Sequence, residues 1–362
     1  MNLEEIFYQF DHTANYMSSI LIKGGHINST YHIITKGFAP DYVLQKINSR
    51  VFKNIPALIQ NKVLVTNFLR QKTPTKNHKN IIEIIPCKSG RYYFIDKQNS
   101  FWNLMIFIPE SVVYTKAKKS EIAGEAGSLF GGFFNLLNDF NVDHLEETIP
   151  HFHDLDFRFK QFEQALKEAC LDRKVMSSDA IAFIKEFQNE MLVLHHLKTK
   201  RKLPLRATHN DTKLSNALFN KKGKGISVID LDTLMPGLVH FDFGDSIRTI
   251  CSSAEEDEKD VSRVCFLIEH FRAFSKGFLS ACGNILTKEE TNRLVLGAQY
   301  MVFIMALRFL TDFLNNDSYF KINYPQHNLV RAKNQMALFR DMIVYEADME
   351  SIIYEINTSR PI

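Results

Sequence analysis

The sequence predicts an α+β protein, with a small antiparallel β-sheet part in residues 1–112 and a larger, mainly helical part in residues 113–362. Short β-type runs bounded by Gly, Pro and Asp crowd the first hundred or so residues. From Ala117 onward, amphipathic patterns of helical period take over. The 362 residues, 45% of them hydrophobic, suffice for two domains or one bilobal unit, and we place the boundary near residues 109–115.

The β-rich part begins, after a first short helix, with a hairpin and a further helix. Residues 31–36 and 42–47 have strand character and are joined by a Gly/Pro/Asp turn. Residues 55–69 carry apolar side chains at helical spacing, and Pro56 suits the first turn of that helix. Three further β-type stretches follow, at residues 81–86, 91–96 and 101–108. Together these elements predict an antiparallel sheet that carries one helix.

The second part is predicted to be helical around one strand-rich island. Helices are expected at residues 159–171, 180–197, 261–282 and 291–314. The island, residues 205–234, interrupts them and holds the densest polar chemistry of the chain. We therefore expect the functional site there.

Composition excludes several classes of function. A formal net charge of +3 without a polybasic tail gives no sign of a nucleic-acid partner. Five widely spaced cysteines without a Cys-x-x-Cys pair indicate reduced thiols in a cytoplasmic protein. Acidic residues stand where a signal peptide needs positive charge, and no apolar run approaches the roughly 20 residues of a membrane span. We expect neither secretion nor membrane insertion, and we favour a monomer.

Residues 209–216 read His-Asn-Asp-Thr-Lys-Leu-Ser-Asn and carry the strongest chemical signal. Their spacing is that of the catalytic loop of protein kinases, in which Asp accepts the proton of the acceptor hydroxyl and Asn holds the metal. This assigns Asp211 as the catalytic base and Asn216 as a magnesium ligand, with Lys213 facing the transferred phosphate. An isolated His-x-Asp is common, so the prediction depends on the order of elements around the motif.

Asn216 needs a carboxylate partner, because Mg²⁺ prefers hard oxygen ligands. Asp230, at the end of the short apolar strand 226–229, lies 14 positions later (230 − 216) and is the predicted partner. The tripeptide Asp242-Phe-Gly resembles the metal-binding tripeptide of protein kinases but lies 26 positions after Asn216 (242 − 216). We interpret Asp242 and Asp245 as supports that bond to backbone, since buried acids need partners.

The order of these elements resembles the aminoglycoside phosphotransferase and choline kinase superfamily, whose bilobal fold is similar to that of protein kinases. Five longer segments look more narrowly like the N-acetylhexosamine 1-kinases: residues 25–31, 209–216, 229–237, 241–248 and 324–331. This resemblance implies a bilobal protein-kinase-like fold. It also implies transfer of the γ-phosphate of ATP, with Mg²⁺, to the anomeric hydroxyl of N-acetylglucosamine or N-acetylgalactosamine.

The resemblance also implies roles for individual residues. Ser29 and Thr30 lie on the strand and turn that would cover the nucleotide phosphates, and His26 would reach from there toward the sugar. Arg308 and Tyr319 match sugar-binding positions of the family. Two structural alternatives stay open: an ion pair between Arg308 and Asp312 at i+4, and simple core packing of Tyr319.

Two departures from the family pattern concern the nucleotide. Gln45 stands where the superfamily usually has a nucleotide-binding lysine, and the adjacent Lys46 should point to the opposite face of its strand. Either the strand is bulged or Gln45 takes the role. Residues 55–69 contain no acid, so the lysine to glutamate ion pair of protein kinases cannot be built there.

Two rival functions remain. One is another small-molecule kinase of the same superfamily, acting on choline, homoserine, a thiosugar or an aminoglycoside; a cationic acceptor would favour acids and aromatic rings around it. The other is a pseudokinase that binds nucleotide without turnover, which the absent lysine suggests. A protein-kinase role is disfavoured, because no Gly-x-Gly-x-x-Gly or Ala-Pro-Glu segment occurs.

Overall fold

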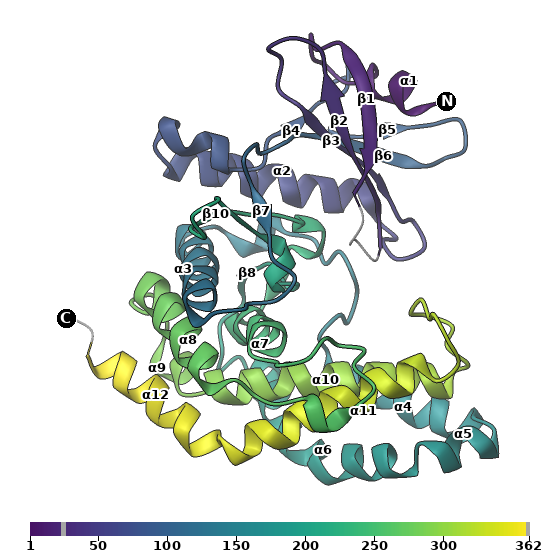
Figure 1. Cartoon of the computed structure of the whole chain (residues 1–362), viewed down its shortest axis with the longest axis vertical. Coiled ribbons are helices and arrows are strands. Elements are labelled where there is room, and N and C mark those ends of the chain that lie inside the picture. Colours follow the sequence, from purple (N-terminus) through teal and green to yellow (C-terminus); the bar gives the residue numbers. More distant parts are fainter. Residues whose placement is uncertain (23–26, 360–362) are drawn as a thin grey trace. The chain divides into compact units, whose positions relative to one another are not determined.

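The computed structural model describes residues 1–22 and 27–359 and divides into two compact units. The first unit contains Met1–Val112, Leu136–Pro150 and Leu218–Pro236. The second contains Val113–Asn135, His151–Ala217 and Gly237–Ile362. The antiparallel sheet belongs to the first unit and most of the helices belong to the second, which confirms the predicted α+β fold class (Figure 1).

The first unit is built on one antiparallel sheet with the strand order β1-β2-β3-β6-β4, in which β5 also pairs with β6. Its strands are β1 (Tyr16–Leu21), β2 (Ser29–Thr35), β3 (Tyr42–Ile47), β4 (Ile84–Ile85), β5 (Phe94–Ile95) and β6 (Phe101–Ile106). The predicted hairpin is β2 and β3. Strand β1 was not predicted, because its six residues are partly or fully exposed and carry no clear alternation.

Two helices accompany this sheet. Helix α1 (Leu3–Phe7) begins with a capping box between Asn2 and Glu5, and Phe7 enters the core with Leu44 and Leu104. Helix α2 (Ile55–Lys72) begins after Asn54, whose side chain accepts the N–H of Ala57. Helix α2 is the helix predicted for residues 55–69, and the pattern underestimated its length by about one turn.

Short strands and 3₁₀ turns make up the remaining regular structure outside the main sheet and the helices. They are β7 (Val112–Val113), β8 (Arg206–Thr208), β9 (Ala217–Phe219), β10 (Gly225–Val228), β11 (Met235–Gly237) and the 3₁₀ turns η1 (Thr75–Asn80), η2 (Val142–His144), η3 (Leu214–Asn216), η4 (Leu231–Thr233) and η5 (Val261–Arg263). Strands β9 and β10 pair through a turn in which Gly223 has φ 78°, a left-handed conformation that glycine adopts without steric cost.

The second unit is helical. Its helices are α3 (Ser120–Leu136), α4 (Leu155–Glu168), α5 (Leu171–Met176), α6 (Ser178–Thr199), α7 (Val239–Ile250), α8 (Ile268–Cys282), α9 (Lys288–Thr291), α10 (Leu294–Leu314), α11 (His327–Val344) and α12 (Glu346–Thr358). Helices α4, α6 and α10 confirm three predicted ones. The helix predicted for residues 261–282 starts later, because 261–263 form the 3₁₀ turn η5 instead.

Helix α10 is the centre of this unit and packs against α4, α6, α7 and α11. It is the one helix within residues 1–22 and 27–359 that is long and apolar enough to cross a membrane by length and composition, so the expectation that no apolar run approaches this length is wrong. However, 83% of its most apolar window is buried inside the protein. A core helix of a globular protein passes the same test.

Helices α3 and α8 cross at backbone contact. A Cβ atom on Gly127 would lie 2.2 Å from the carbonyl oxygen of Phe274, and one on Gly277 would lie 2.2 Å from that of Gly124. These glycines lower intrinsic helix propensity, which is why the sequence pattern did not reveal α3. Their function is close packing rather than flexibility.

Candidate active site

The predicted catalytic loop, residues 209–216, lies between β8 and β9 and is held by α7. Asp242 of α7 accepts two backbone N–H groups of the loop, that of His209 at 2.9 Å and that of Asn210 at 2.7 Å. Ser246, one turn later, donates its hydroxyl to the carbonyl oxygen of Thr212 at 3.0 Å. The Asp-Phe-Gly tripeptide is therefore part of a helix and supports the loop, as the sequence analysis expected.

Burial disfavours the charged form of the Asp242 carboxylate. Its side chain is only 4% exposed, and burial raises its pKa to about 6, although the two backbone N–H groups act in the opposite direction. The loop backbone itself is strained, since Asn210 has φ 63°. Two buried hydrogen bonds to a carboxylate hold Asn210 in this conformation, directly before Asp211.

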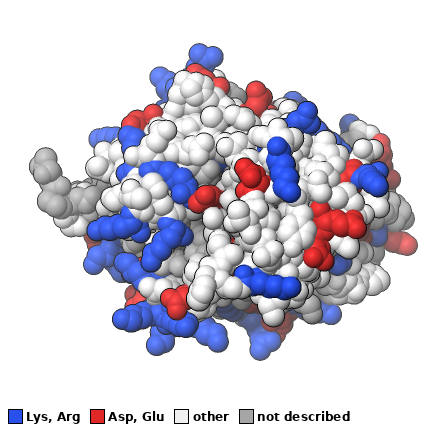
Figure 2. Space-filling view, turned by 90° about the horizontal axis from the view of Figure 1, so that it is seen from above, with Lys and Arg blue, Asp and Glu red and all other residues white. Residues whose placement is uncertain are grey.

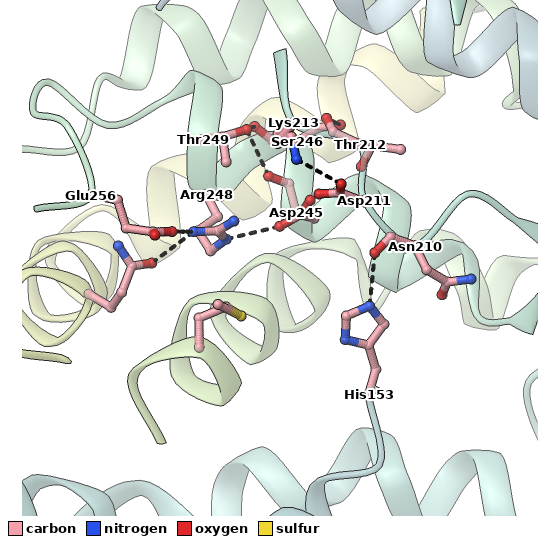
Figure 3. A network of polar contacts seen from close by, with 12 residues as sticks. His153, Asn210, Asp211, Thr212, Lys213, Asp245, Ser246, Arg248, Thr249 and Glu256 are labelled. Atoms are coloured by element: carbon pink, nitrogen blue, oxygen red, sulfur yellow. Dashed lines mark hydrogen bonds and ion pairs between the residues drawn. The ribbon is translucent and has the colours of Figure 1, made fainter. Parts of the chain in front are cut away.

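Asp211 lies at the centre of a small polar network (Figure 3). Its Oδ2 accepts from Nζ of Lys213 at 2.8 Å and from Nδ2 of Asn216 at 3.0 Å. Partial burial favours the protonated acid, but the charge and hydrogen bond of Lys213, followed by His209 and Asn216, outweigh it and lower the pKa of Asp211 below its ordinary value. Asp211 is therefore a carboxylate at neutral pH.

The amide of Asn216 is oriented by Asp211. Its Nδ2 donates to the backbone carbonyl of Asp211 at 2.8 Å as well as to the carboxylate. With the amide nitrogen committed to Asp211, the carbonyl oxygen Oδ1 is the atom of Asn216 that suits a hard cation.

Asp230, the other predicted metal ligand, belongs to the first unit, where it precedes η4 in a left-handed conformation (φ 61°). Within residues 1–22 and 27–359, no group of three or more His, Cys, Asp or Glu side chains could hold a metal by itself. Mg²⁺ that arrives with a nucleotide needs fewer protein ligands, typically one or two carboxylates, because phosphate oxygens and water complete its shell. The oxygen donors of Asn216 and Asp230 fit that chemistry.

Asp245 corrects one expectation. It was expected to bond to backbone, but its Oδ1 accepts from Nε of Arg248 at 2.9 Å, and Arg248 also donates to Glu256 at 2.6 Å. Its Oδ2 is buried without a hydrogen-bond partner among the described residues. Burial raises the pKa of Asp245, and the charge of Asp211 adds to this effect even though Arg248 opposes it. In Figure 3, Asp245 lies beside Asp211 and between Arg248 and Lys213.

Arg308 lies among aromatic rings. Its guanidinium carbon is 5.1 Å from the ring centre of Phe152, 5.5 Å from that of Phe320 and 5.9 Å from that of Tyr319. The structure thus brings two predicted sugar-binding residues, Arg308 and Tyr319, into contact. The Arg308 to Asp312 ion pair does not form, because the Asp312 carboxylate accepts the backbone N–H groups of Tyr319 and Phe320. Tyr319 is 57% exposed, which excludes simple core packing.

Two neighbours of Arg308, Arg158 and His153, were not predicted as site residues. Partial burial, followed by the charge of Arg308, lowers the pKa of Arg158 to about 10. His153 donates from Nε2 to the carbonyl oxygen of Asn210 at 3.1 Å, and burial lowers its pKa to about 3, so it is neutral. The charges of Arg308, Arg158 and Asp211 all act on His153. No motif marks these two residues in the sequence, because only the folded chain brings His153 to the predicted catalytic loop and Arg158 near Arg308.

The predicted nucleotide residues lie in the first unit. Ser29 and Thr30 begin β2, and Thr30 pairs with Gln45 across to β3. Strand β3 keeps a regular register with both neighbours, so it is not bulged. Lys46 lies over the ring of Trp102, 5.5 Å from its centre, on the face opposite to buried Gln45. His26 lies outside the described residues.

A buried lysine lies next to Gln45. Nζ of Lys62, in α2, is 3.4 Å from Oε1 of Gln45 and 2.6 Å from Oδ1 of Asp232. The other carboxylate oxygen of Asp232 accepts from the side chain of Asn28. No sequence pattern marks Lys62 as buried, because a lysine in an amphipathic helix is usually exposed.

The face of the molecule shown in Figure 2 carries charges of both signs. On the face seen in Figure 2, basic and acidic side chains are interspersed with uncharged ones, although basic residues gather toward the lower left. This mixed face agrees with the formal net charge of +3.

The fold has counterparts among solved structures. An aminoglycoside phosphotransferase from Alicyclobacillus acidocaldarius matches with a TM-score of 0.56 at 11% identity, over 99% of this chain and 97% of the other. A choline kinase from Cryptosporidium parvum matches with a TM-score of 0.56 at 12% identity, over 95% and 93%. A spectinomycin phosphotransferase in complex with ADP and spectinomycin matches with a TM-score of 0.50 at 13% identity, over 95% of each chain. At these identities the likeness establishes the fold alone.

Membership of a family follows from the sequence itself. Residues 19–261 match the phosphotransferase enzyme family. The match covers well over half of the chain and includes strands β2 to β6 of the antiparallel sheet and the loop that carries Asp211. The chain therefore belongs to the phosphotransferase enzyme family.

Proposed function

We propose that this protein is an ATP- and Mg²⁺-dependent kinase that phosphorylates the anomeric hydroxyl of an N-acetylhexosamine, N-acetylglucosamine or N-acetylgalactosamine. One observation carries the kinase part: Asp211 is an ionised, partly exposed carboxylate on a loop that Asp242 fixes from behind. ADP in the related spectinomycin phosphotransferase supports a nucleotide as the phosphate donor. We further propose that the protein is a monomer in the cytoplasm, where ATP is available.

Asp211 acts as the base in this reaction. An oxygen of the carboxylate accepts the hydrogen bond of the acceptor hydroxyl, orients its lone pair toward the γ-phosphorus and takes the proton. The new O–P bond forms as the bond between the γ-phosphorus and the bridging oxygen breaks, and ADP leaves with that oxygen. A loose transition state places little demand on base strength, so a carboxylate with a lowered pKa suffices. Lys213 then balances negative charge between Asp211 and the transferred phosphoryl group.

The metal would be held by Oδ1 of Asn216 and the carboxylate of Asp230. When bound, Mg²⁺ supplies positive charge to the phosphate oxygens of the nucleotide. The chain contributes oriented oxygen donors, because Asp211 fixes the amide of Asn216. On the nucleotide side, Ser29 and Thr30 are assigned to the phosphates, and Gln45 is assigned to the nucleotide-binding strand β3.

The charges around Arg308 support a neutral, oxygen-rich acceptor. Arg308 and Arg158 form no ion pair with a carboxylate in the part of the chain that the structure describes, and the charge of Arg308 adds to burial in lowering the pKa of Arg158. The nearby acids Asp245 and Glu256 both bond to Arg248. Two such arginines would repel choline, ethanolamine or an aminoglycoside, whereas guanidinium N–H groups donate well to hydroxyl and acetamide oxygens. Arg308, Tyr319 and His26 are the proposed sugar contacts.

A phosphate-transfer assay with a panel of sugars and amines tests the proposal. The full chain is incubated with ATP and Mg²⁺, and phosphorus NMR identifies the product. We expect turnover with N-acetylhexosamines and an anomeric phosphate coupled to H1. A 6-phosphate, or turnover only with amines, would reject the sugar assignment and leave a small-molecule kinase of the same family. Nucleotide binding without any transfer would indicate a pseudokinase.

A further inference from the structure

The nucleotide half of the chain lacks the usual phosphate-binding lysine. In protein kinases a lysine on the third strand contacts the nucleotide phosphates and pairs with a glutamate on the neighbouring helix. Here β3 carries Gln45 at that position, and α2 contains no acid. The regular register of β3 turns Lys46 to the other face, over Trp102, so it cannot replace the missing cation.

Helix α2 supplies a cation, Lys62, next to Gln45 of β3. Lys62 is 1% exposed, and its ammonium contacts Oδ1 of Asp232 and Oε1 of Gln45. A lysine ammonium has three N–H donors, and contacts among the described residues account for two of them. Relative to the protein-kinase pair, the cation has moved from the strand to the helix, and the anion has moved from the helix to the turn η4.

The surroundings of this ammonium point to phosphate chemistry. Asp232 lies two residues after Asp230 and also accepts from Asn28, directly before Ser29 and Thr30 of β2. Asn28 is fixed in turn, because its Oδ1 accepts the backbone N–H of Asn48 at 2.9 Å. Asp232 therefore links Lys62 to the turn assigned to the nucleotide phosphates and lies close in sequence to the predicted metal ligand, and all these residues belong to the first unit.

A purely structural role is a poor account of this arrangement. A buried ion pair loses most of its attraction to the cost of removing both charges from water, and apolar residues of similar volume often stabilise a protein as well or better. A lysine and an aspartate at almost complete burial, 1% and 4% exposed, are therefore an expensive way to fill space. They are useful where a fixed positive charge is needed.

We propose that Lys62 is the nucleotide-binding cation of this protein: its ammonium, positioned by Asp232 and Gln45, donates its third hydrogen bond to a phosphate oxygen of the nucleotide. Gln45 then orients the lysine rather than binding the phosphate itself. This inference rests on the proposed use of ATP but not on the identity of the acceptor.

The test measures ATP binding to the full chain by calorimetry without Mg²⁺, so that metal binding does not contribute. Loss of a charge-assisted hydrogen bond in Lys62→Met should weaken ATP binding about 10- to 100-fold. Lys46→Met, on the opposite face of β3, is the matched control and should stay within about 2-fold. Equal affinity of Lys62→Met and the wild type would overturn the inference, whereas a wild type that binds no ATP either without or with Mg²⁺ would overturn the proposed function as well.

A double variant separates binding from folding. Lys62→Met alone leaves the buried Asp232 charge uncompensated and can unfold the protein. Lys62→Met with Asp232→Asn removes both charges, so the melting temperature should recover while ATP affinity stays low. Recovery of both quantities would reduce the pair to a structural contact and sink the inference.

Relocating the charge provides a gain-of-function test. Gln45→Lys combined with Lys62→Met returns the ammonium to the strand, close to Asp232. This double variant should regain at least about 10-fold of the lost ATP affinity. Gln45→Met combined with Lys62→Met is its uncharged control and should regain none. Equal affinity of the two double variants would contradict a requirement for a cation at this place.

Discussion

Nζ of Lys213 lies 2.8 Å from Oδ2 of Asp211, and both side chains are 27% exposed. Lys213 and Asp211 are two residues apart on one loop. Their ion pair is partly exposed to solvent, where an acceptor hydroxyl would arrive in the proposed reaction. It keeps the candidate base ionised, and it also keeps a cation beside the oxygen that would take up the proton in the proposed reaction.

Replacing Asp211 by Asn should remove the base without removing the loop. The amide keeps the shape and can still bond to Asn216, but it cannot accept a proton. We expect turnover to fall by about 10² to 10⁴ while ATP affinity is largely kept. Steady-state kinetics with calorimetric ATP binding measure both quantities, and unchanged turnover would reject the assignment of the base.

Replacing Lys213 by Met should change the pH profile as well as the rate. Lys213 opposes the effect of burial and lowers the pKa of Asp211, so its removal should raise that pKa and move the acid limb of kcat/KM to higher pH. Lys213→Arg keeps the charge and serves as the control, with the limb left in place. An unmoved limb in Lys213→Met would show that the ion pair does not control Asp211.

Asp242 should make stability depend on pH. Its folded-state pKa of about 6 lies above the ordinary value, so its contribution to stability is fully present below the unfolded pKa and is lost as pH rises through about 6. Between pH 5 and pH 8 the free energy of unfolding of the wild type should fall by about 1 kcal/mol relative to Asp242→Asn. Urea titrations of the two proteins across this range measure the difference. A constant difference would contradict the raised pKa.

Arg308 should affect the acceptor and not the nucleotide. Truncation to Ala removes guanidinium donors that aromatic rings hold in place, so we expect KM for the sugar to rise about 10-fold or more with KM for ATP unchanged. Arg272→Ala is the control, because Arg272 is half-exposed and pairs with Glu355 of α12. A rise in KM for ATP alone would place Arg308 on the nucleotide side.

Phosphate transfer should require Mg²⁺, with Asp230 as one of its proposed ligands. We expect Asp230→Ala to abolish transfer, and an excess of EDTA to abolish transfer by the wild type until Mg²⁺ is restored. Transfer that continues in EDTA would refute the magnesium site.

Local patterns revealed the fold class and much of the catalytic loop. Alternation in β2 and β3 and the period of α4, α6 and α10 depend on nearby residues, so the sequence displays them directly. Helices α3 and α7 were missed for opposite reasons. Glycines weaken the pattern of α3, and burial on all sides of α7 places polar residues such as Asp242 where an amphipathic pattern expects apolar ones.

The remainder of the site depends on contacts between distant segments. Lys62 and Asp232 are 170 positions apart, and His153 and Asn210 are 57 apart. A single sequence contains no signal for such pairs, because side-chain type and spacing report only local structure. The absent acid in α2 was visible, but the compensating lysine 17 positions after Gln45 became meaningful only in three dimensions.

The contact between α3 and α8 has a consequence for protein engineering. Replacing helical glycine by alanine is a standard route to higher thermostability, worth up to about 1 kcal/mol where space allows. At Gly127, Gly131 or Gly277 an added methyl group would meet backbone at 2.2 to 2.6 Å and push the two helices apart. Helix α8 also contacts α7, which carries Asp242. Alanine at these three glycines would therefore loosen the predicted catalytic loop through α7, although none of them belongs to that loop.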